Sequence, residues 1–450
     1  MSHLSVAKFG GTSVANYPAM QSCANIVIAD PNTRVVVLSA SAGVTNLLVA
    51  LANGCEEPER NKLLNEVRQI QENILTELKD DSRVRPKIEA LLANITSLAE
   101  AANLATSLAL TDELISHGEM MSSLIFVEVL RELQIEATWL DVRTIVATNS
   151  NFGKAAPNDE QTRQNCDNLL KPLIERGELV ITQGFIGRDE QGKTTTLGRG
   201  GSDYSAALLA EVLNAQDVLI WTDVAGIYTT DPRIVQTAQR IDTMSFSEAA
   251  EMATFGAKVL HPATLLPAVR SNIPVYVGSS KAPQDGGTWV TRNPQPRPTF
   301  RAIALRRDQT LLTLSSLNML YAQGFLANIF TILAKHKISV DTITTSEVSV
   351  ALTLDKTGSA SSGKSLLSQE LIEELSQFCT VKVDTGLSLV ALIGNELHTA
   401  SGVAKRIFET LDAYNIRMIS YGASTNNICL LADSDKADDI VRSLHRSLFE

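Results

Sequence analysis

The sequence predicts an α/β domain in which helices cover both faces of a sheet, followed by two smaller α+β units of βαββ type. Three observations support this prediction. About the first 290 residues alternate short apolar runs with helical segments, as in sheets whose strands are joined by helices. Residues 281–300 contain four prolines and two glycines, a composition typical of a domain boundary. Beyond that boundary, one pattern of strands and helices occurs twice.

Five apolar runs predict strands of the first domain, at Leu4–Phe9, Arg34–Ser39, Glu178–Gln183, Asp217–Thr222 and Ile273–Val277. Several of these runs are apolar at nearly every position, which suits central strands covered on both faces. Between about residues 55 and 135 the sequence is helical with few strand signals. We expect this stretch to be an insertion on one side of the sheet, in a domain that spans residues 1–295.

The repeat after the boundary has an offset of 78 residues. Each copy has a strand, a helix and two further strands, which predicts one unit at 300–385 and another at 386–450. A strand at 300–305 is compatible with either unit; in the second, it would make the first unit an insertion. Each helix repeats apolar residues at i, i+3, i+4 and i+7, predicting one buried face. These positions are Leu326, Ile329, Phe330 and Leu333, and Ala404, Ile407, Phe408 and Leu411.

The composition excludes several classes of protein. The net charge of −11 argues against a general nucleic-acid surface, which needs a basic face. Five scattered cysteines without a C-x-x-C pair favour reduced thiols over disulfides or a zinc site, and so a cytoplasmic location. No stretch reaches the roughly 18 apolar residues of a membrane span. The six histidines form no metal-binding pattern.

Two glycine-rich loops predict a site for an anionic substrate. In the first loop, Gly10 and Gly11 directly follow the first predicted strand, and Lys8 lies at the end of that strand. Glycines let backbone N–H groups approach phosphate oxygens, and a lysine neutralises their charge. By itself this could be a surface lysine beside an ordinary turn. The turn that begins at Ser39, after the second predicted strand, could equally be a simple connection.

The second loop, residues 199–203, opens a predicted helix. Ser202 or Asp203 is the expected N-cap of this helix, so the loop could be only a well-capped helix start. Arg199 ahead of Gly200 and Gly201 also suits a bidentate clamp on a carboxylate.

Residues 187–194 satisfy the P-loop pattern G-x-x-x-x-G-K-[ST] letter by letter, but their context is wrong. A P-loop threonine starts a helix, whereas Thr194 begins a run that favours a strand. Asp189 and Glu190 would also place negative charge against phosphates. We therefore predict a β-hairpin with its tip at residues 189–192.

These loops, together with the segments 111–119, 221–233 and 255–262 and the tandem repeat, resemble the aspartokinase branch of the amino acid kinase family, whose repeats are ACT domains. The resemblance covers essentially the whole chain. It implies an amino acid kinase-type sheet between helices. It also implies transfer of phosphate from ATP to the side-chain carboxylate of L-aspartate, giving 4-phospho-L-aspartate, with Mg²⁺ accompanying the nucleotide.

The resemblance also implies site residues. The catalytic residues would be Lys8, Asp203 and Lys258. Without the resemblance, Glu119 would read as one exposed helix acid among many. The aspartate site would consist of Ser39, Thr45, Glu119, Arg199, Gly200, Gly201 and Ser202. The ATP site would consist of Lys8, Gly10, Gly11, Thr222, Asp223, Tyr228, Arg233, Lys258 and Val259, and no metal-binding protein residues are predicted.

The repeat gives an indication of an effector. The first unit has Asp341 and Glu347 where the second has Ile419 and Thr425, so only the first offers carboxylates to a cationic ligand. Lysine fits this pattern better than threonine, although two solvated surface acids would look the same. The resemblance to lysine-inhibited aspartokinases nominates Met319, Ala322, Phe325, Leu326, Ser339, Val340, Asp341, Ser346 and Glu347.

Family resemblance further implies a homodimer or a larger assembly through the ACT units, with no nucleic-acid or membrane partner. Two alternatives stay open. The chain could be a related kinase that phosphorylates glutamate, acetylglutamate, carbamate or UMP. It could also be an amino-acid sensor whose kinase half has lost catalysis, although Lys8, Asp203 and Lys258 argue against that.

Overall fold

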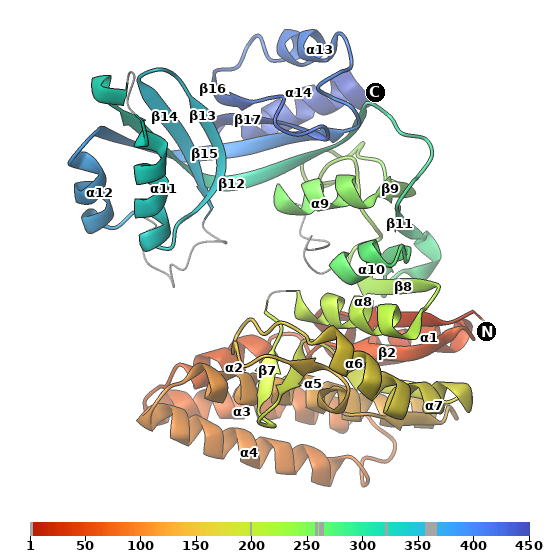
Figure 1. The fold of residues 1–450 in the computed structure, drawn as a ribbon. Helices are drawn as coiled ribbons and strands as arrows, with labels where there is room; N and C mark the ends of the chain where they lie inside the picture. The colour runs from red at the N-terminus through yellow and green to blue at the C-terminus, as the bar shows by residue number, and fades with distance from the viewer. Residues whose placement is uncertain (1–2, 199, 257–259, 261–264, 320–322, 356–366) are drawn as a thin grey trace. The chain divides into compact units, whose positions relative to one another are not determined.

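A computed structural model describes residues 3–198, 200–256, 260, 265–319, 323–355 and 367–450. By its internal contacts the chain divides into two compact units (Figure 1). The first unit contains residues 1–227, 240–249 and 258–295, and the second contains residues 228–239, 250–257 and 296–450. No helix in the described ranges is long and apolar enough to cross a membrane.

The first unit is built on an eight-stranded sheet whose central strands are parallel. Buried branched residues fill these strands, as the near-continuous apolar runs predicted, and the structure shifts the last predicted strand to begin at Val275. Only the pairing of β10 with β11 is antiparallel among the pairings described in this sheet. In order across the sheet the strands are β3 (Ala137–Trp139), β5 (Leu179–Gln183), β2 (Thr33–Leu38), β1 (Ser5–Phe9), β8 (Asp217–Thr222), β10 (Val275–Ser279), β11 (Gly287–Thr291) and β9 (Thr243–Ser245).

Helices of the long insertion pack on one side of this sheet, as predicted (Figure 1). Their apolar faces join Phe9, Val36 and Leu38 in one core. The helices on that side are α1 (Tyr17–Ala29), α2 (Val44–Ala52), α3 (Glu57–Leu75), α4 (Arg85–Leu104) and α5 (Leu108–Glu132). The other helices of this unit are α6 (Asp159–Asn165), α7 (Lys171–Glu175), α8 (Gly201–Leu213), which contacts β1, β2 and β8, and α10 (Leu266–Arg270).

The P-loop-like segment forms a hairpin, as predicted from its flanking residues. Strands β6 (Ile186–Asp189) and β7 (Thr194–Thr196) pair antiparallel, and β6 also pairs with β4 (Ala147–Thr148). Gly192 has φ of 80° at the hairpin tip, and its N–H donates to the Asp189 carbonyl. Lys193 therefore lies in a hairpin and does not begin a helix.

The second unit contains a six-stranded antiparallel sheet with two cores. Residues 300–306 pair with the second half of β15, in the half of the sheet that holds β16 and β17, whereas residues 310–315 pair with β14. The strand order is β13 (Ser339–Thr345), β14 (Ser349–Asp355), β12 (Phe300–Ser315), β15 (Thr380–Gly394), β17 (Asn427–Asp433) and β16 (Ile416–Ser420). The helices are α11 (Phe325–Lys335), α12 (Gln369–Ser376), α13 (Val403–Thr410) and α14 (Ala437–Phe449).

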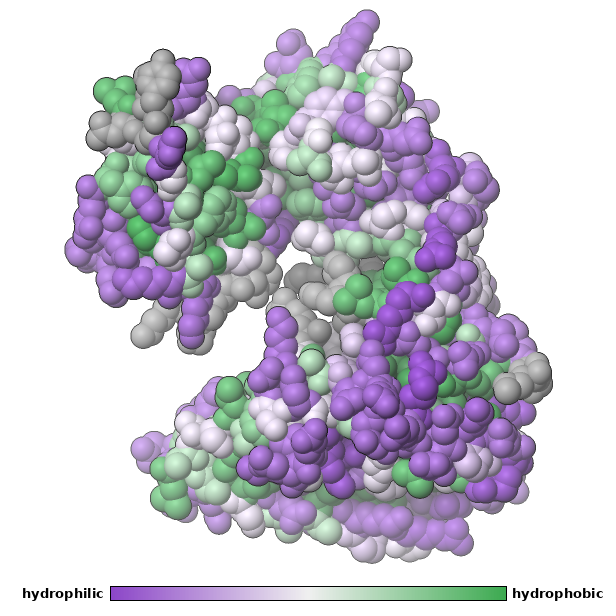
Figure 2. Space-filling view, viewed as in Figure 1, coloured by the Kyte–Doolittle hydropathy of each residue, from purple (hydrophilic) through white to green (hydrophobic). Residues whose placement is uncertain are grey.

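The predicted apolar faces of the two repeated helices are only partly buried. Ile329 and Leu333 of α11 are buried with Phe325, but Leu326 and Phe330 are 38% and 41% exposed. Phe408 of α13 is exposed in the same way. The apolar stripe of each helix is wider than the contact of that helix with the sheet, so the edge of the stripe stays outside the core. Figure 2 shows an apolar patch over the part of this unit that holds α11 and β14.

Two short segments that precede the boundary pack within the second unit. Residues 228–239 bring Val235 into the core of β12, β15 and α14, and the Ile303 N–H donates to the Thr229 carbonyl at 2.7 Å. Helix α9 (Phe246–Thr254) continues from the first unit into residues 250–257. There Glu251 accepts hydrogen bonds from Ser424 and Asn427 at 2.8 and 2.7 Å.

Candidate active site

A buried ion pair joins the two glycine-rich loops predicted from the sequence. Lys8 is on β1 and Asp203 is in the first turn of α8, and the Lys8 Nζ lies 2.7 Å from the Asp203 carboxylate. Both side chains are largely buried, at 11% and 14% exposed. Ion pairs removed from water interact strongly, so this pair fixes an ammonium group beside the start of a helix.

Helix α8 begins without the side-chain cap that the sequence predicted. Gly200, with φ of 73°, occupies the N-cap position, and no side chain caps the helix. Ser202 and Asp203 are already inside the first turn, where Asp203 pairs with Lys8 instead of the helix backbone. Glycine adopts this left-handed conformation without strain because it has no Cβ, which explains why Gly200 stands where a capping residue is usual.

The loop after β1 packs closely at Gly11 against the turn after β2. A Cβ on Gly11 would come 2.8 Å from the Ala40 carbonyl oxygen. The Gly10 N–H donates to the Trp221 carbonyl at 3.1 Å, and the Ser39 N–H donates to the Phe9 carbonyl at 3.2 Å. The ends of β1, β2 and β8 therefore meet at one sheet edge, where ligands of open α/β sheets bind.

Glu119 is buried, contrary to the reading of an exposed helix acid. It lies on α5 and is 3% exposed. One carboxyl oxygen accepts from the Ala40 N–H at 3.3 Å, and the other has no hydrogen-bond partner in the described protein. Loss of hydration disfavours the charged form and raises the pKa of Glu119 to about 8. Thr45, on α2, is half-buried.

The other predicted substrate and nucleotide residues are distributed as follows. Ser39 is half-buried, and its carbonyl accepts from the Ser122 hydroxyl. Thr222 ends β8 and donates to the carboxylate of exposed Asp223. Arg199, Lys258 and Val259 lie outside the described residues. Tyr228 and Arg233 belong to the second unit, where exposed Arg233 pairs with Asp231 at 2.7 Å.

The predicted effector residues differ in their surroundings. Phe325 packs in the core, edge-on against Phe378 at 5.6 Å, which gives it a structural role. Asp341 pairs with Arg306 at 2.9 Å and both side chains are largely buried, whereas Glu347 is exposed. The remaining residues fall into three groups: Met319, Ser339 and Val340 are half-buried; Leu326 and Ser346 are exposed; and Ala322 lies outside the described residues.

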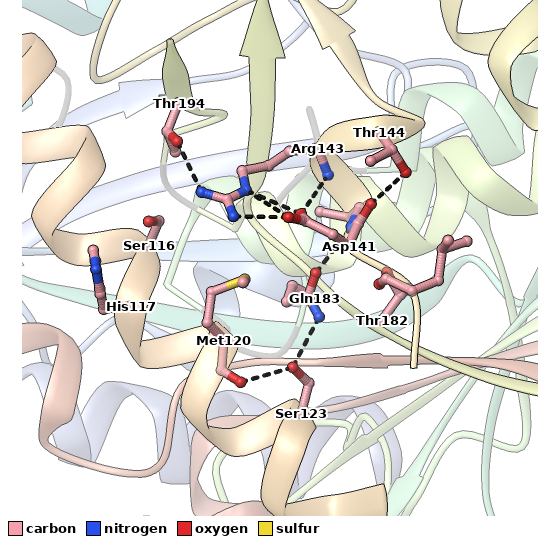
Figure 3. A network of polar contacts seen from close by, with 12 residues as sticks. Ser116, His117, Met120, Ser123, Asp141, Arg143, Thr144, Thr182, Gln183 and Thr194 are labelled. Carbon is pink, nitrogen blue, oxygen red and sulfur yellow. Dashed lines mark hydrogen bonds and ion pairs between the residues drawn. The ribbon is translucent and has the colours of Figure 1, made fainter. Parts of the chain in front are cut away.

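A polar network that the sequence did not predict includes Ser123 of α5 (Figure 3). Arg143 pairs with Asp141 at 2.7 Å and donates to the Thr194 hydroxyl at 3.1 Å. The Gln183 side chain accepts from the Val142 N–H and donates to Ser123 of α5 at 2.8 Å. The network thus joins α5, the end of β5 and the start of β7.

A second tie between α5 and β7 comes from Asp112, which is fully buried and accepts hydrogen bonds from Thr196. A signal in the sequence could have found it: Asp112 precedes Glu119 by seven residues, so both acids lie on one face of α5.

Comparison with known proteins places this geometry in a family. The sequence model of the amino acid kinase family matches residues 3–279, and an ACT domain model matches residues 390–448. The lysine-sensitive aspartokinase 3 of Escherichia coli is 62% identical over the full length of both chains. The chain belongs to the amino acid kinase family, among the aspartokinases.

Other aspartokinases agree with this assignment. The chloroplastic aspartokinase 3 of Arabidopsis thaliana is 35% identical, with 99% of this chain and 81% of that protein covered. The crystal structure of E. coli aspartokinase III with aspartate and ADP, described as the R-state, has a TM-score of 0.90 at 61% identity and full coverage of both chains. The structure of that aspartokinase with lysine and aspartate, the T-state, gives 0.88 at the same identity and coverage.

Proposed function

We propose that this aspartokinase transfers the γ-phosphoryl group of ATP to the side-chain carboxylate of L-aspartate, forming 4-phospho-L-aspartate. The observation that supports this most directly is the Lys8–Asp203 pair at the start of α8, together with the buried carboxyl of Glu119 on α5. The E. coli relative with aspartate and ADP bound has the same fold over its whole length.

The reaction requires positioning and positive charge more than it requires a base, because a carboxylate is already deprotonated at neutral pH. Lys8 would stabilise negative charge on the transferring phosphoryl group, and Asp203 would hold the Lys8 ammonium in place. The first-turn N–H groups of α8 add partial positive charge. Arg199 and Lys258 are proposed to bind the aspartate carboxylate and the phosphates, respectively.

Glu119 would bind the ammonium group of aspartate. Its unpartnered carboxyl oxygen is the kind of buried acceptor that a bound cation would satisfy. Since burial raises the pKa of Glu119 to about 8, arrival of an ammonium group must release the proton. Ser39, Thr45 and the glycines of the second loop would complete the aspartate site.

The nucleotide site is proposed to include Gly10, Gly11, Thr222, Asp223, Tyr228, Arg233 and Val259, together with the lysines already named. Mg²⁺ would neutralise charge on the phosphate oxygens and arrive with ATP. Among the described residues no group of three or more acids, histidines or cysteines could hold a metal ion.

Turnover of the purified protein with Mg-ATP and L-aspartate tests this proposal. Hydroxylamine would trap the acyl phosphate as a hydroxamate, and glutamate, acetylglutamate, carbamate and UMP would be offered as competing acceptors. Hydroxamate from aspartate alone is the expected result. Phosphorylation of another acceptor would support a related kinase, and nucleotide binding without turnover would support a sensor.

We also propose that L-lysine inhibits the enzyme through the first ACT-like unit, with Asp341 binding its side-chain ammonium. The supporting observation is a buried carboxylate that already pairs with the cationic Arg306. Asp341→Ala should raise the lysine concentration needed for half inhibition about tenfold or more. Asp384→Ala is the matched control, because Asp384 also pairs with an arginine, Arg417, at 3.3 Å. Unchanged inhibition in Asp341→Ala would sink this assignment.

Assembly is proposed to occur through the second unit. Its exposed apolar side chains include Leu326, Phe330, Ile343, Val348 and Val383. Single exposed apolar residues are normal on a protein surface, but several on one unit favour an interaction site. Light scattering on Phe330→Glu and on the wild type should show a smaller species for the variant. The same mass for both would argue against this surface as the interface.

A further inference from the structure

We propose that Asp112 is a positioning residue that holds the segment leading into the aspartate-binding loop against helix α5. The inference rests on the aspartate kinase activity proposed above. Asp112 has no exposed surface and lies one residue after the start of the segment 111–119. It is not among the residues for which the family resemblance implies a role.

The Asp112 carboxylate accepts hydrogen bonds from two segments distant in the sequence. The Thr196 N–H and hydroxyl donate to its two oxygens, each at 2.8 Å. The Gly153 N–H lies 2.9 and 3.1 Å from the same oxygens. The Ala155 N–H in turn donates to the Thr196 carbonyl at 2.8 Å, so the two segments are also bonded to each other.

The partners of Asp112 are donors, which explains why a carboxylate is required. Two backbone N–H groups and a hydroxyl converge on it, and an ionised carboxylate offers about four acceptor positions. Burial raises the pKa of Asp112, while the hydrogen bonds from Gly153 and Thr196 act in the opposite direction. An asparagine of the same size would turn its NH₂ group toward one of these donors and leave it unpaired.

The position of Asp112 connects two parts of the aspartate site. Thr196 ends β7, four residues before Gly200. Glu119 is two helical turns after Asp112, about 10 Å further along the same face of α5. The Asp112 side chain therefore fixes the position at which the loop toward Asp203 begins. That position is fixed relative to α5, the helix that carries Glu119. A displacement on the order of 1 Å in such a site can reduce rates about a hundredfold.

The network of Arg143 and Gln183 predicts that the fold survives loss of the Asp112 hydrogen bonds. Arg143 holds Thr194 at the start of β7, and Gln183 holds Ser123 on α5 (Figure 3). These bonds do not involve Asp112. We therefore expect the hairpin and α5 to stay folded in Asp112 variants while the end of β7 loses its fixed position.

The test compares steady-state kinetics of Asp112→Asn with the wild type. The KM for aspartate should rise about tenfold or more, as expected for loss of hydrogen bonds to a charged group, with the KM for ATP within about twofold. Thr196→Val should shift the KM for aspartate in the same direction by less, and Thr196→Ser, which keeps the hydroxyl, should restore it. Glu128→Gln is the control, since Glu128 is a buried acid of α5 that pairs with Arg131 instead.

Hydrogen exchange of the backbone amides gives a readout that does not depend on activity. In Asp112→Asn, amides of residues 196–198 and 200–203 should exchange faster, while those of β5 and β6 keep their protection. An unchanged KM for aspartate together with unchanged exchange would overturn the inference, as would an equal effect of Glu128→Gln. A wild type that gives no hydroxamate from aspartate would refute the proposed activity, and the exchange comparison would still decide the role of Asp112.

Discussion

Glu119 combines deep burial with an incomplete set of hydrogen bonds. Its pKa lies at about 8, against an ordinary 4.5, because burial removes hydration from the charged form. Between these two pH values the unfolded chain has released a proton that the folded protein retains. Stability contributed by this group is therefore lost as the pH rises from about 4.5 to about 8, and the loss is constant above that.

The pH dependence of aspartate binding should follow from the raised pKa of Glu119. If Glu119 must be ionised to bind the substrate ammonium, the KM for aspartate should fall about tenfold per pH unit as the pH rises toward 8, and then level off. Steady-state kinetics between pH 6 and 9 would measure this slope. Glu119→Gln should bind aspartate weakly at every pH, and a Gln variant that keeps the wild-type slope would contradict the assignment.

Glu119→Gln should also be more stable than the wild type at pH 8.5, because a neutral amide avoids the cost of a buried charge. Thermal unfolding should show a higher Tm for the variant at pH 8.5 and a much smaller difference at pH 5. The opposite dependence on pH would show that the carboxylate has a partner that stabilises its charge.

Lys8 provides the sharpest test of phosphoryl-group stabilisation. Lys8→Met keeps the length and apolar stem of the side chain but removes the charge beside Asp203. We expect kcat to fall by roughly two to three orders of magnitude, as for loss of one preorganised transition-state contact. Lys193→Met should keep wild-type kcat, because Lys193 lies in a hairpin that matches a P-loop only in its sequence pattern. Equal losses in both variants would indicate a general effect on folding.

At the scale of elements, strands and connections could be predicted better than helix ends and faces. The strand Asp217–Thr222 is predicted with its observed bounds, because its four middle residues, 218–221, are all apolar, as in strands covered on both faces. The predicted N-cap of α8 was wrong, because Asp203 pairs instead with Lys8, which lies on the distant strand β1. Local sequence favours Asp203 as a cap, and only the tertiary pairing reveals its actual partner.

The start of α8 also depends on close packing around Gly201. A Cβ at this position would lie 2.6 Å from a ring carbon of Phe185 and 3.1 Å from its Cα. Gly201→Ala should therefore displace the helix start, cost about 1–3 kcal/mol of stability and raise the KM for aspartate. Thermal unfolding and kinetics would measure both effects.

Gly192→Ala is the control for backbone strain alone. Gly192 has φ of 80° at the hairpin tip, and a Cβ there would contact nothing within 4 Å. We expect a loss of roughly 1 kcal/mol in stability with unchanged kinetics. A kinetic effect equal to that of Gly201→Ala would mean that the close packing at Gly201 has no special importance.

At the scale of the whole molecule, the sequence boundary near residue 295 does not coincide with the division by contacts. Segments 228–239 and 250–257 belong to the second unit although they precede the boundary. The sequence could not show this, because their partners lie on β12, β17 and α14, as with the 2.9 Å contact between Thr229 and His445. Periodicity identifies apolar segments without identifying what covers them.

Residues 1–295 expressed alone should consequently be less stable than the same residues in the full chain. Val235 would lose its core, and Glu251 would lose Ser424 and Asn427. We expect lower soluble yield and faster proteolysis within 228–257 than within β1, β2 or β5. Limited proteolysis with mass spectrometry would locate the cuts, and equal resistance of that segment in both proteins would contradict this prediction.

The placement of these two segments has a consequence for recombination between relatives. A chimera joined near residue 295 would pair the second unit of one parent with residues 228–239 and 250–257 of another, and so mismatch contacts such as Thr229–His445 and Glu251–Asn427. A second unit that is to be exchanged between aspartokinases should therefore be transferred as three pieces of sequence, even though its contacts make it one compact unit.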